Sequence, residues 1–324
     1  MIELVSSTRE VSARAPSPVI PLNLSQCRAI WAAHGLGDVP RVVWFPRRTE
    51  PYAGQVGELF AIVDEGPVDA ILFVEERHNA SRDNLRDVMG WLQAPIIDLS
   101  GRAGEYADVH FDIARPETWA QTAACIMDFR VRRSRLAPGM RDSFDPEIQL
   151  LAHAYVSARP LVARHYPLVK DAVSYPGHRS AAVSVPVARR LVAKGLLRQE
   201  FFDRVHECGS CGSRRQTVRE ECPSCRSAHL SEVELVHHYH CASLLPESRF
   251  RQGTSLVCPK CSQQLRNYGK DYDRPGRALA CEGCGKMSSE PDVGVLCRDC
   301  GTRCNGDAAR AVDLHSYYLT EEAV

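Results

Sequence analysis

Cysteine is the residue type with the clearest chemical potential in this chain. Of its fourteen cysteines, twelve lie between Cys208 and Cys304, and only Cys27 and Cys125 precede them. They recur as Cys-x-x-Cys pairs, a spacing that lets a tight turn direct both sulfur atoms at one metal ion about 2.3 Å away. We therefore predict structural zinc in a reducing, cytoplasmic compartment rather than the disulfide framework of an exported protein.

Six ligand pairs of this spacing are present. Five are Cys-x-x-Cys, and the sixth is His238-x-x-Cys241 within the run HHYHC. At two ligands each, six pairs satisfy three tetrahedral zinc ions. The predicted ligands are Cys208, Cys211, Cys222, Cys225, His238, Cys241, Cys258, Cys261, Cys281, Cys284, Cys297 and Cys300.

The simplest pairing joins consecutive pairs, so that each zinc ion closes one β-hairpin ribbon. Site one would then be Cys208, Cys211, Cys222 and Cys225; site two would be His238, Cys241, Cys258 and Cys261; site three would be Cys281, Cys284, Cys297 and Cys300. The gaps also permit interleaved sites. His237 or His240 could replace His238, and Cys304 could replace Cys300.

Four protein ligands at every site indicate structural zinc, because a catalytic ion keeps one position open for water. The sequence contains neither a His-Glu-x-x-His motif nor a deaminase-type His-x-Glu signature. It also shows no phosphate-binding loop and no recognisable nucleophile–base pair. We therefore expect a protein that is not an enzyme.

Charge bears on the type of partner. The whole chain has a formal net charge of zero, and His206–Gly306 holds fourteen Lys and Arg against twelve Asp and Glu. Eleven thiolates and three zinc ions would bring that segment to about −3, whereas a nucleic-acid module presents a basic field. A protein partner is thus favoured. DNA binding is the alternative, since PVARRLVAKGLLRQE resembles the end of a winged-helix unit.

The first half of the chain must supply a separate fold. Short apolar runs predict strands at residues 41–45, 70–74, 95–98 and 108–111. Helical spacing is found in residues 54–66 and 81–93 and in a helix that begins at Pro116. Alternating strands and helices predict a parallel sheet of the flavodoxin-like or receiver-like type.

Further helices are expected before the cysteines. Asp145 can cap a helix that begins at Pro146, with a buried stripe at Ile148, Leu151, Ala152 and Tyr155, and Gly195 can end a second helix. The predicted organisation is a loose tail at 1–22, an α/β domain at 23–133, a basic linker with helices at 134–205, tandem zinc ribbons at 206–306 and a C-terminal extension at 307–324. No window has the length of apolar sequence that a membrane helix needs.

The segment from Pro146 to Cys304 resembles the thaumarchaeal output domain family. The similarity rests on DRVHECGSC, ECPSC, LVHHYHCASLLPESRFRQG, LVCPKCSQQLRNYGKDYDRPG and the last two Cys-x-x-Cys pairs. Members of that family look like non-catalytic zinc-ribbon output or protein-interaction modules attached to receiver-like and cyclic-di-GMP-related proteins. The resemblance implies an adaptor in such a signalling pathway.

The α/β part resembles a degenerate receiver. PIIDLSG, with Ser100, is similar to a receiver's fourth strand, and IARPETW places Arg115 where a lysine precedes proline. Pro46 and Arg47 follow the first strand where an acidic pair would hold Mg²⁺, and Glu75, read as a surface glutamate, stands beside the position of the third-strand aspartate. Without these carboxylates phosphoryl transfer lacks electrostatic support. The resemblance therefore implies a pseudo-receiver used for docking or for a homodimer.

Candidate partner contacts lie in the most specific part of the output-domain similarity. The loop from Arg266 to Pro275 alternates charged and aromatic residues and ends in a turn former. The alternatives are a connector whose Asp and Arg brace adjacent ribbons, or an exposed contact surface. The candidates are Phe250, Arg251, Gln252, Arg266, Tyr268, Asp271, Tyr272, Asp273 and Arg274.

Overall fold

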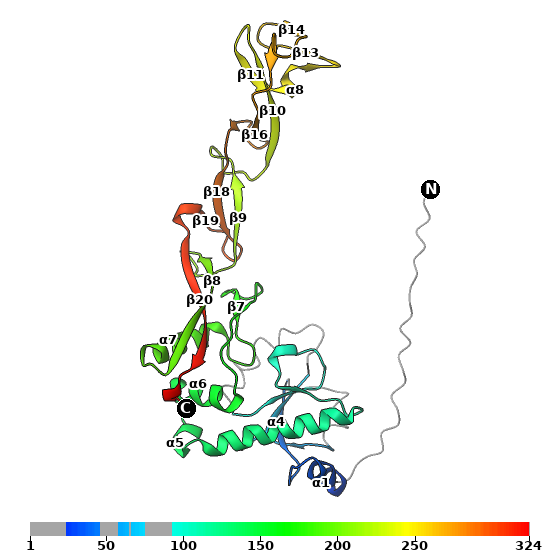
Figure 1. Ribbon diagram of the computed structural model, residues 1–324, viewed down its shortest axis with the longest axis vertical. Coiled ribbons are helices and arrows are strands. Elements are labelled where there is room, and N and C mark those ends of the chain that lie inside the picture. Colours follow the sequence, from blue (N-terminus) through cyan, green and yellow to red (C-terminus); the bar gives the residue numbers. More distant parts are fainter. Residues whose placement is uncertain (1–23, 46–57, 65, 75–92, 324) are drawn as a thin grey trace, which may run out of the picture. The chain divides into compact units, whose positions relative to one another are not determined.

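The computed structural model describes residues 24–45, 58–64, 66–74 and 93–323 (Figure 1). The chain divides into two compact units. Unit 1 comprises Met1–Val162, Tyr175–Gln199 and Tyr317–Val324, and unit 2 comprises Ala163–Ser174 and Glu200–Ser316. The tail at 1–22 and the helix expected at 81–93 lie outside the described residues, apart from Gln93, which lies in a bend. No helix in the described parts of the chain combines the length and the apolar character needed to cross a bilayer.

Unit 1 contains a five-stranded parallel sheet with the order β2-β1-β3-β4-β5. Its strands are β1 (Arg41–Phe45), β2 (Ala61–Ile62), β3 (Ala70–Phe73), β4 (Ile96–Asp98) and β5 (Val109–His110). The strands predicted at 41–45, 70–74, 95–98 and 108–111 correspond to β1, β3, β4 and β5. The sheet is parallel, as the alternation of elements predicted.

The helix expected over residues 54–66 is wrong for the part that is described. Residues 58–60 form a turn and a bend, and Ala61–Ile62 form the edge strand β2, paired in parallel with Arg41 and Val42. Leu59 and Phe60 are buried against the sheet. The apolar residues here have helical spacing because Leu59 and Phe60 pack into the core from a turn. The edge strand β2 has only two residues, which is too short to show the alternation typical of a strand.

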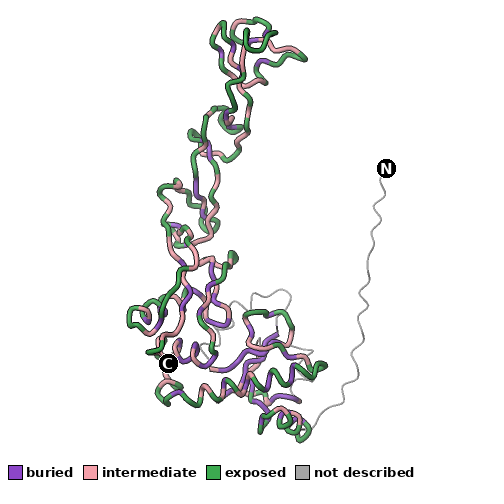
Figure 2. Tube along the Cα trace, in the orientation of Figure 1, coloured by how far each residue is buried: buried purple, intermediate pink, exposed green. Residues whose placement is uncertain are grey.

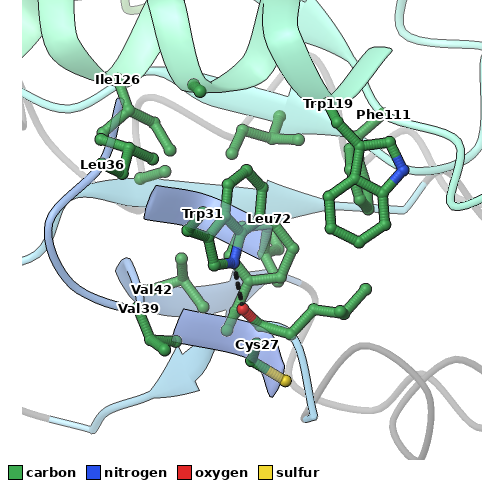
Figure 3. Close-up of a cluster of buried hydrophobic side chains, with 14 residues drawn as sticks. Cys27, Trp31, Leu36, Val39, Val42, Leu72, Phe111, Trp119 and Ile126 are labelled. Atoms are coloured by element: carbon green, nitrogen blue, oxygen red, sulfur yellow. Dashed lines mark hydrogen bonds between the residues drawn. The ribbon is translucent and has the colours of Figure 1, made fainter. Parts of the chain in front are cut away.

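An aromatic cluster fills one face of this sheet (Figure 3). Trp31, on helix α1 (Leu24–Ala33), is fully buried, and its ring centroid lies 5.2 Å from that of Phe60 and 5.3 Å from that of Trp119. The indole N–H of Trp31 donates to the Leu59 carbonyl at 2.7 Å, so the buried polar atom is satisfied. The sheet and its covering helices thus share one core.

Helix α4 (Pro116–Arg135) covers this cluster with the face predicted from sequence. Pro116 occupies the first turn, and Trp119, Ala123 and Ile126 are buried. The helix ends at Arg135, so it extends only into the first two residues of the segment expected to hold a basic linker and helices. A short helix α5 (Pro138–Arg141) follows it.

Two further helices belong to unit 1. Helix α6 (Pro146–Ser157) begins as expected, because the Asp145 carboxylate accepts hydrogen bonds from the N–H groups of Glu147 and Ile148. Its buried stripe is displaced from the predicted one: Ala152 is buried, but Ile148, Leu151 and Tyr155 are only half-buried. The buried residues are Leu150, Ala152, His153, Ala154, Val156 and Ser157.

The small residues Ala152 and Ala154 account for that shift, because α6 packs against α4 on one side and against α7 on another. Helix α7 (Ala181–Ala193) is followed by Gly195, whose positive φ of 74° ends the helix as predicted. The remaining elements of unit 1 are the 3₁₀ helices η1 (Gly104–Tyr106) and η3 (Glu321–Ala323), whereas the paired strands β6 (Arg164–His165) and β7 (Val173–Ser174) belong to unit 2.

Unit 2 is an out-and-back antiparallel ladder. The outgoing chain forms β9 (Gln216–Glu221) and β10 (Leu230–His238), and the returning chain forms β16 (Arg277–Cys281) and β18 (Asp292–Cys297). Strand β9 pairs with β18 and β10 pairs with β16, as Figure 1 shows. The other strands are β11 (Ser243–Pro246), β12 (Arg251–Gln252), β13 (Ser255–Val257), β14 (Gln264–Leu265), β15 (Tyr272–Asp273), β17 (Met287–Ser288) and β19 (Arg303–Asn305), with helices α8 (Glu247–Phe250) and η2 (Gly306–Ala308).

The segment expected as an extension at 307–324 is part of the fold. It forms strand β20 (Arg310–Leu319), which pairs with β8 (Leu197–Glu207). Strand β8 ends immediately before Cys208, and β20 follows the last cysteine. The cysteine-rich segment is thus an insertion between two paired strands.

Candidate metal centres

The structure brings the twelve predicted ligands together in three groups of four. Within each group the candidate ligand atoms all lie within 4.8 Å of one another. We name these groups by their residues: centre A is Cys208, Cys211, Cys297 and Cys300; centre B is Cys222, Cys225, Cys281 and Cys284; centre C is His238, Cys241, Cys258 and Cys261.

The sequential pairing predicted for sites one and three is wrong. Cys208 and Cys211 lie with the last Cys-x-x-Cys pair of the chain rather than with the next one, and Cys222 and Cys225 lie with Cys281 and Cys284. Only centre C has the composition that the sequential pairing gives. The arrangement is nested, with centre C innermost.

The β-ladder explains the nesting. Gln216 pairs with Cys297 at one end of β9–β18, and Glu221 pairs with Asp292 at the other. Leu230 then pairs with Cys281, so β10–β16 starts where the previous strand pair ended. Each outgoing pair of ligands therefore meets the returning pair that the register places opposite, and six residues of β9 separate centres A and B by about 20 Å.

The sulfur geometry fits a tetrahedral ion. Four sulfur ligands at about 2.3 Å from zinc lie about 3.8 Å from one another. In centre A the Sγ atoms of Cys208 and Cys300 are 3.6 Å apart, as are those of Cys211 and Cys297. In centre B the corresponding distances are 3.7 Å for Cys222–Cys284 and 3.5 Å for Cys225–Cys281. The donor sets are therefore compatible with zinc.

Centre C uses one imidazole. His238 is buried, and its Nδ1 lies 3.3 Å from the Sγ of Cys241 and 3.5 Å from the Sγ of Cys261. Of the alternative histidines, His237 faces Asp273 at 3.4 Å, and neither it nor His240 belongs to the group. Cys304, the alternative to Cys300, lies on β19 outside centre A.

A repeated backbone turn sets each Cys-x-x-Cys pair. The N–H of the first cysteine donates to the carbonyl five residues later, and its own carbonyl accepts from the N–H four residues later. This pattern recurs at Cys208, Cys222, Cys258, Cys281 and Cys297 with distances of 2.8–3.0 Å. The residue directly after the second ligand has positive φ in all six pairs; these residues are Gly212, Arg226, Ala242, Ser262, Gly285 and Gly301.

We expect this turn to make Gly212→Ala destabilising. Gly212 has φ of 72°, where an L-residue with a Cβ costs about 1–2 kcal/mol. The matched control is Gly209→Ala in the same turn, where φ is not positive and a Cβ would meet no atom within 4 Å. The midpoint of metal release against a competing chelator measures the effect, and equal midpoints for both variants would contradict it.

Backbone hydrogen bonds within the turns stabilise cysteine thiolates, whereas contacts between neighbouring cysteines limit how many thiolates can form. The N–H groups of Cys225 and Ser224 stabilise the Cys222 thiolate and lower its pKa to about 7. Cys225 receives a hydrogen bond from Ser227 that favours its thiolate, yet its contacts with Cys284 and Cys281 raise its pKa to about 12. Four neighbouring thiols resist full ionisation on their own, so all four would become thiolates together only with a bound cation.

Polar contacts outside the ligands hold the opposing turns together. In centre A the buried Ser213 donates to Asp299 at 2.5 Å, and Arg215 pairs with the same carboxylate at 2.7 Å. These residues join the first Cys-x-x-Cys turn to the last. Sequence reasoning did not identify them, although Ser213 and Asp299 stand within two residues of a ligand.

A buried ion pair lies beside centre B. Glu221 is fully buried and pairs with Arg219 and Arg226 at 2.8 Å each. Burial opposes ionisation of Glu221, but the hydrogen bonds from Arg226 and Arg219 lower its pKa. Gly294 on the neighbouring strand leaves the necessary space, since a Cβ there would lie 2.3 Å from the Glu221 carboxyl carbon. The fit between Gly294 and Glu221 has no sequence signal, because these two residues are far apart in the chain, although Arg219 and Arg226 are near neighbours of Glu221.

The predicted partner residues have different environments. Phe250 is fully buried in a core with Val236, Cys258 and Leu265, so its side chain is not available for a partner. Tyr272 packs against the same core. Arg251 and Gln252 are exposed on β12, and Tyr268 is 66% exposed.

The charged members of the loop mostly brace it. Asp271 accepts hydrogen bonds from the backbone N–H groups of Arg266 and Asn267 at 2.9 Å. Arg274 pairs with Glu247 at 2.8 Å, and Arg251 pairs with the same glutamate. The sequence analysis does not identify Glu247, which lies on the short helix α8 four residues before Arg251, the first residue of β12. These contacts support the bracing interpretation for Asp271 and Arg274.

The part of the chain that matches a known protein family is the part that carries the three centres. The model of the thaumarchaeal output domain 1 family matches residues 140–319, more than half of the chain. The chain belongs to the thaumarchaeal output domain 1 family. The match includes β8, β20 and all three centres, so the paired strands are part of the output domain. No curated protein matches the chain, and neither does any solved structure.

Membership in an output-domain family is compatible with a role in signalling, and the three groups are compatible with zinc binding. The family match begins at residue 140 and does not cover the parallel sheet. Ser100 and Arg115, the two described residues of the receiver resemblance, make local contacts: the Ser100 hydroxyl donates to Asp98 at 2.6 Å, and Arg115 pairs with Asp112 at 3.3 Å. Pro46, Arg47 and Glu75 lie outside the described residues.

Proposed function

We propose that this protein is a non-enzymatic, cytoplasmic adaptor whose zinc-ribbon output domain binds a protein partner in a signalling pathway. The observation that supports it best is the closed donor set of each centre: four protein ligands leave no position for a substrate or a reactive water. Three zinc ions then act as structural elements. The ribbons present a surface instead of a reaction site.

The N-terminal sheet supports the signalling part of the proposal. Its order, β2-β1-β3-β4-β5 with all pairs parallel, is the order of flavodoxin-like folds, to which receivers belong. We assign it as a pseudo-receiver in a pathway linked to two-component or cyclic-di-GMP signalling. In this assignment it serves docking or homodimerisation and not phosphoryl transfer.

The partner surface that we propose lies on the ribbon around centre C. Leu244 and Asp273 lie opposite His237 on the two neighbouring strands, so the three side chains share one face of the sheet. Tyr239 packs against His237 with ring centroids 5.4 Å apart. Tyr268 is an electrostatic neighbour of Tyr239 and completes this surface, which we call the distal face.

Exposure favours the distal face as a contact surface. Tyr268 is 66% exposed, Leu244 48% and Tyr239 42%. Exposed tyrosines are typical of interface hot spots because they add large contact area at a small cost in conformational entropy. Burial raises the pKa of Tyr239, and the Asp273 carboxylate beside the ring adds to this effect.

The test removes both exposed rings. We expect the double variant Tyr239→Ala with Tyr268→Ala to keep the metal content of the wild type but to lose capture of the partner from nuclease-treated native lysate. Binding of the double variant to the identified and purified partner is then measured with the two purified proteins, and it should be lost there as well. Each hot-spot tyrosine is expected to contribute about 2 kcal/mol or more to binding. The matched control is Val218→Ala, which alters an apolar side chain that is 58% exposed on β9.

Two results would contradict the proposal. Undiminished capture by the double tyrosine variant would exclude the distal face. Recovery of nucleic acid, with strong salt dependence, in a parallel capture from lysate without nuclease treatment would favour the DNA-binding alternative. The relevant structural feature for that alternative is the succession of α7 and the paired strands β8 and β20.

A further inference from the structure

The three centres differ in how far their ligands are exposed to solvent. In centre B two of the four ligands, Cys225 and Cys284, are exposed, whereas centre A has one exposed ligand, Cys300, and centre C has none. The oxidation of a cysteine depends on its thiolate character and on its exposure. Cysteines that bind zinc are thiolates in every centre, so exposure is the property that distinguishes the centres.

Apolar cover also distinguishes the centres. The ligands of centre B lie in segments 222–230 and 281–291, and the structure describes every residue of both. The only buried residues in these two segments are Cys222 and Cys281, which are themselves ligands. At centre C, by contrast, one ligand is part of an apolar core whose buried members are Val236, Phe250, Cys258 and Leu265. No buried apolar side chain from its own segments shields the thiols of centre B.

Centre A lies between these two cases. Its one exposed thiol, Cys300, has the Thr302 hydroxyl at 3.2 Å from its Sγ. The residue before it, Asp299, is held by Ser213 and Arg215 of the opposing turn. The thiols of centre B are therefore the most accessible to a small molecule in solution, and those of centre C are the least accessible.

Each exposed thiol of centre B has a second thiol within reach. The Sγ atom of Cys225 lies 3.5 Å from that of Cys281, and the Sγ atom of Cys284 lies 3.7 Å from that of Cys222. An oxidised cysteine beside another thiol can form a disulfide, which a thiol reductant reverses. Centre B thus combines an accessible thiol with a resolving thiol.

We propose that centre B is a redox switch that hydrogen peroxide opens. The Cys225 thiolate attacks one peroxide oxygen: an S–O bond forms, the O–O bond breaks, and the hydroxide that leaves takes up a proton. The Cys281 thiolate then attacks the Cys225 sulfur, so that an S–S bond forms, the S–O bond breaks and a second hydroxide leaves and is protonated. Two thiolates have passed two electrons to one peroxide, which has become two water molecules. With only two thiolates left, centre B loses its zinc ion.

The position of centre B gives this loss a structural consequence. Glu221 and Asp292 form the last pair of β9–β18, and Leu230 and Cys281 form the first pair of β10–β16. The ligands of centre B lie in the segments that connect these two strand pairs. Opening of centre B would therefore create a hinge there, while centres A and C keep their ions. This inference rests on the zinc-ribbon adaptor proposed above and gives it an oxidant as an input.

The experiment adds hydrogen peroxide in substoichiometric steps to the full-length protein, after elemental analysis has shown three bound zinc ions. A zinc-binding dye measures release. The protein is then denatured in chelator, its free thiols are alkylated with a light reagent, and its disulfides are reduced and alkylated with a heavy one. We expect about one ion in three to leave first, with the heavy label on cysteines of centre B and the light label on those of centres A and C. A thiol reductant with added zinc should restore the lost ion.

The matched control is Cys304→Ser. Cys304 is half-buried and lies outside all three groups, so its removal should leave both the amount of zinc released and the order of labelling unchanged. Loss of the peroxide response in this variant would place the reactive thiol at Cys304 and would overturn the proposal.

Other results would also overturn the switch. Heavy label that appears first at centre A or centre C, or at all three centres together, would do so, as would zinc release without any heavy label or retention of all three ions in excess peroxide. These outcomes would leave the zinc-ribbon adaptor intact. A starting protein with fewer than three ions would instead contradict the adaptor's zinc content, and the switch with it.

Discussion

Removal of zinc is expected to unfold the ribbons of unit 2 while the parallel sheet of unit 1 stays folded. Between residues 200 and 316 eleven apolar or cysteine side chains are buried, and five of these are metal ligands. The other six are Val236, Phe250, Leu265, Ala278, Val295 and Leu314. So few buried side chains cannot hold 117 residues together, and buried positions are correspondingly sparse in this part of the chain (Figure 2).

Bound zinc would supply the missing free energy. Zinc contributes about 10–16 kcal/mol per ion in small zinc-binding domains, comparable to the entire stability of a typical domain. By contrast, the sheet of unit 1 has a continuous core around Trp31 and Trp119 and contains none of the predicted ligands. We therefore expect the two units to respond differently to the same chelator.

Hydrogen exchange followed by mass spectrometry measures this directly. After a strong chelator removes the metal, peptides covering β9, β10, β16 and β18 should exchange rapidly, and zinc should restore their protection. All four tryptophans lie at or before residue 119, so tryptophan emission serves as an internal control that should not change. Protection of the four strands in demonstrably metal-free protein would show that zinc does not hold the ribbons.

The nested pairing predicts a distinctive pattern of metal loss in double cysteine variants. Cys211→Ser with Cys300→Ser removes two ligands from centre A alone, so the protein should fall from about three zinc ions to about two. Cys211→Ser with Cys225→Ser removes one ligand each from centres A and B. That variant should fall to about one ion, because an incomplete thiolate set binds zinc much more weakly.

Both double variants delete the same number of thiols, which makes them matched controls for each other. Sequential pairing predicts the opposite zinc contents. Cys211 and Cys225 would then share one site, so their double variant would keep about two ions, and Cys211→Ser with Cys300→Ser would keep about one. Cys304→Ser should retain the wild-type content, because this residue lies outside every group. Elemental analysis of the purified proteins distinguishes the two pairings, and equal metal contents for the two double variants would agree with neither.

Local features of unit 1 were largely readable from the sequence. Apolar runs predicted four of the five strands, Asp145 and Pro146 marked the start of α6, and Gly195 marked the end of α7. Each signal acts within a few residues, through capping, backbone conformation or the period of a strand. Where packing decides, the same reasoning is wrong: helical spacing predicts a helix over the segment that forms β2, and the buried face of α6 is displaced from the predicted stripe.

The sequence by itself determined which residues form the ligand pairs, because two residues between ligands fix a turn whose hydrogen bonds close within six residues. Only the tertiary structure decided which pairs share a centre. Cys208 and Cys300 are 92 positions apart and meet because the registers of β9–β18 and β10–β16 bring the returning chain back beside the outgoing one. The same folding buried Phe250 and left Tyr268 exposed, a difference that depends on neighbours distant in the chain and on no property of the two residues themselves.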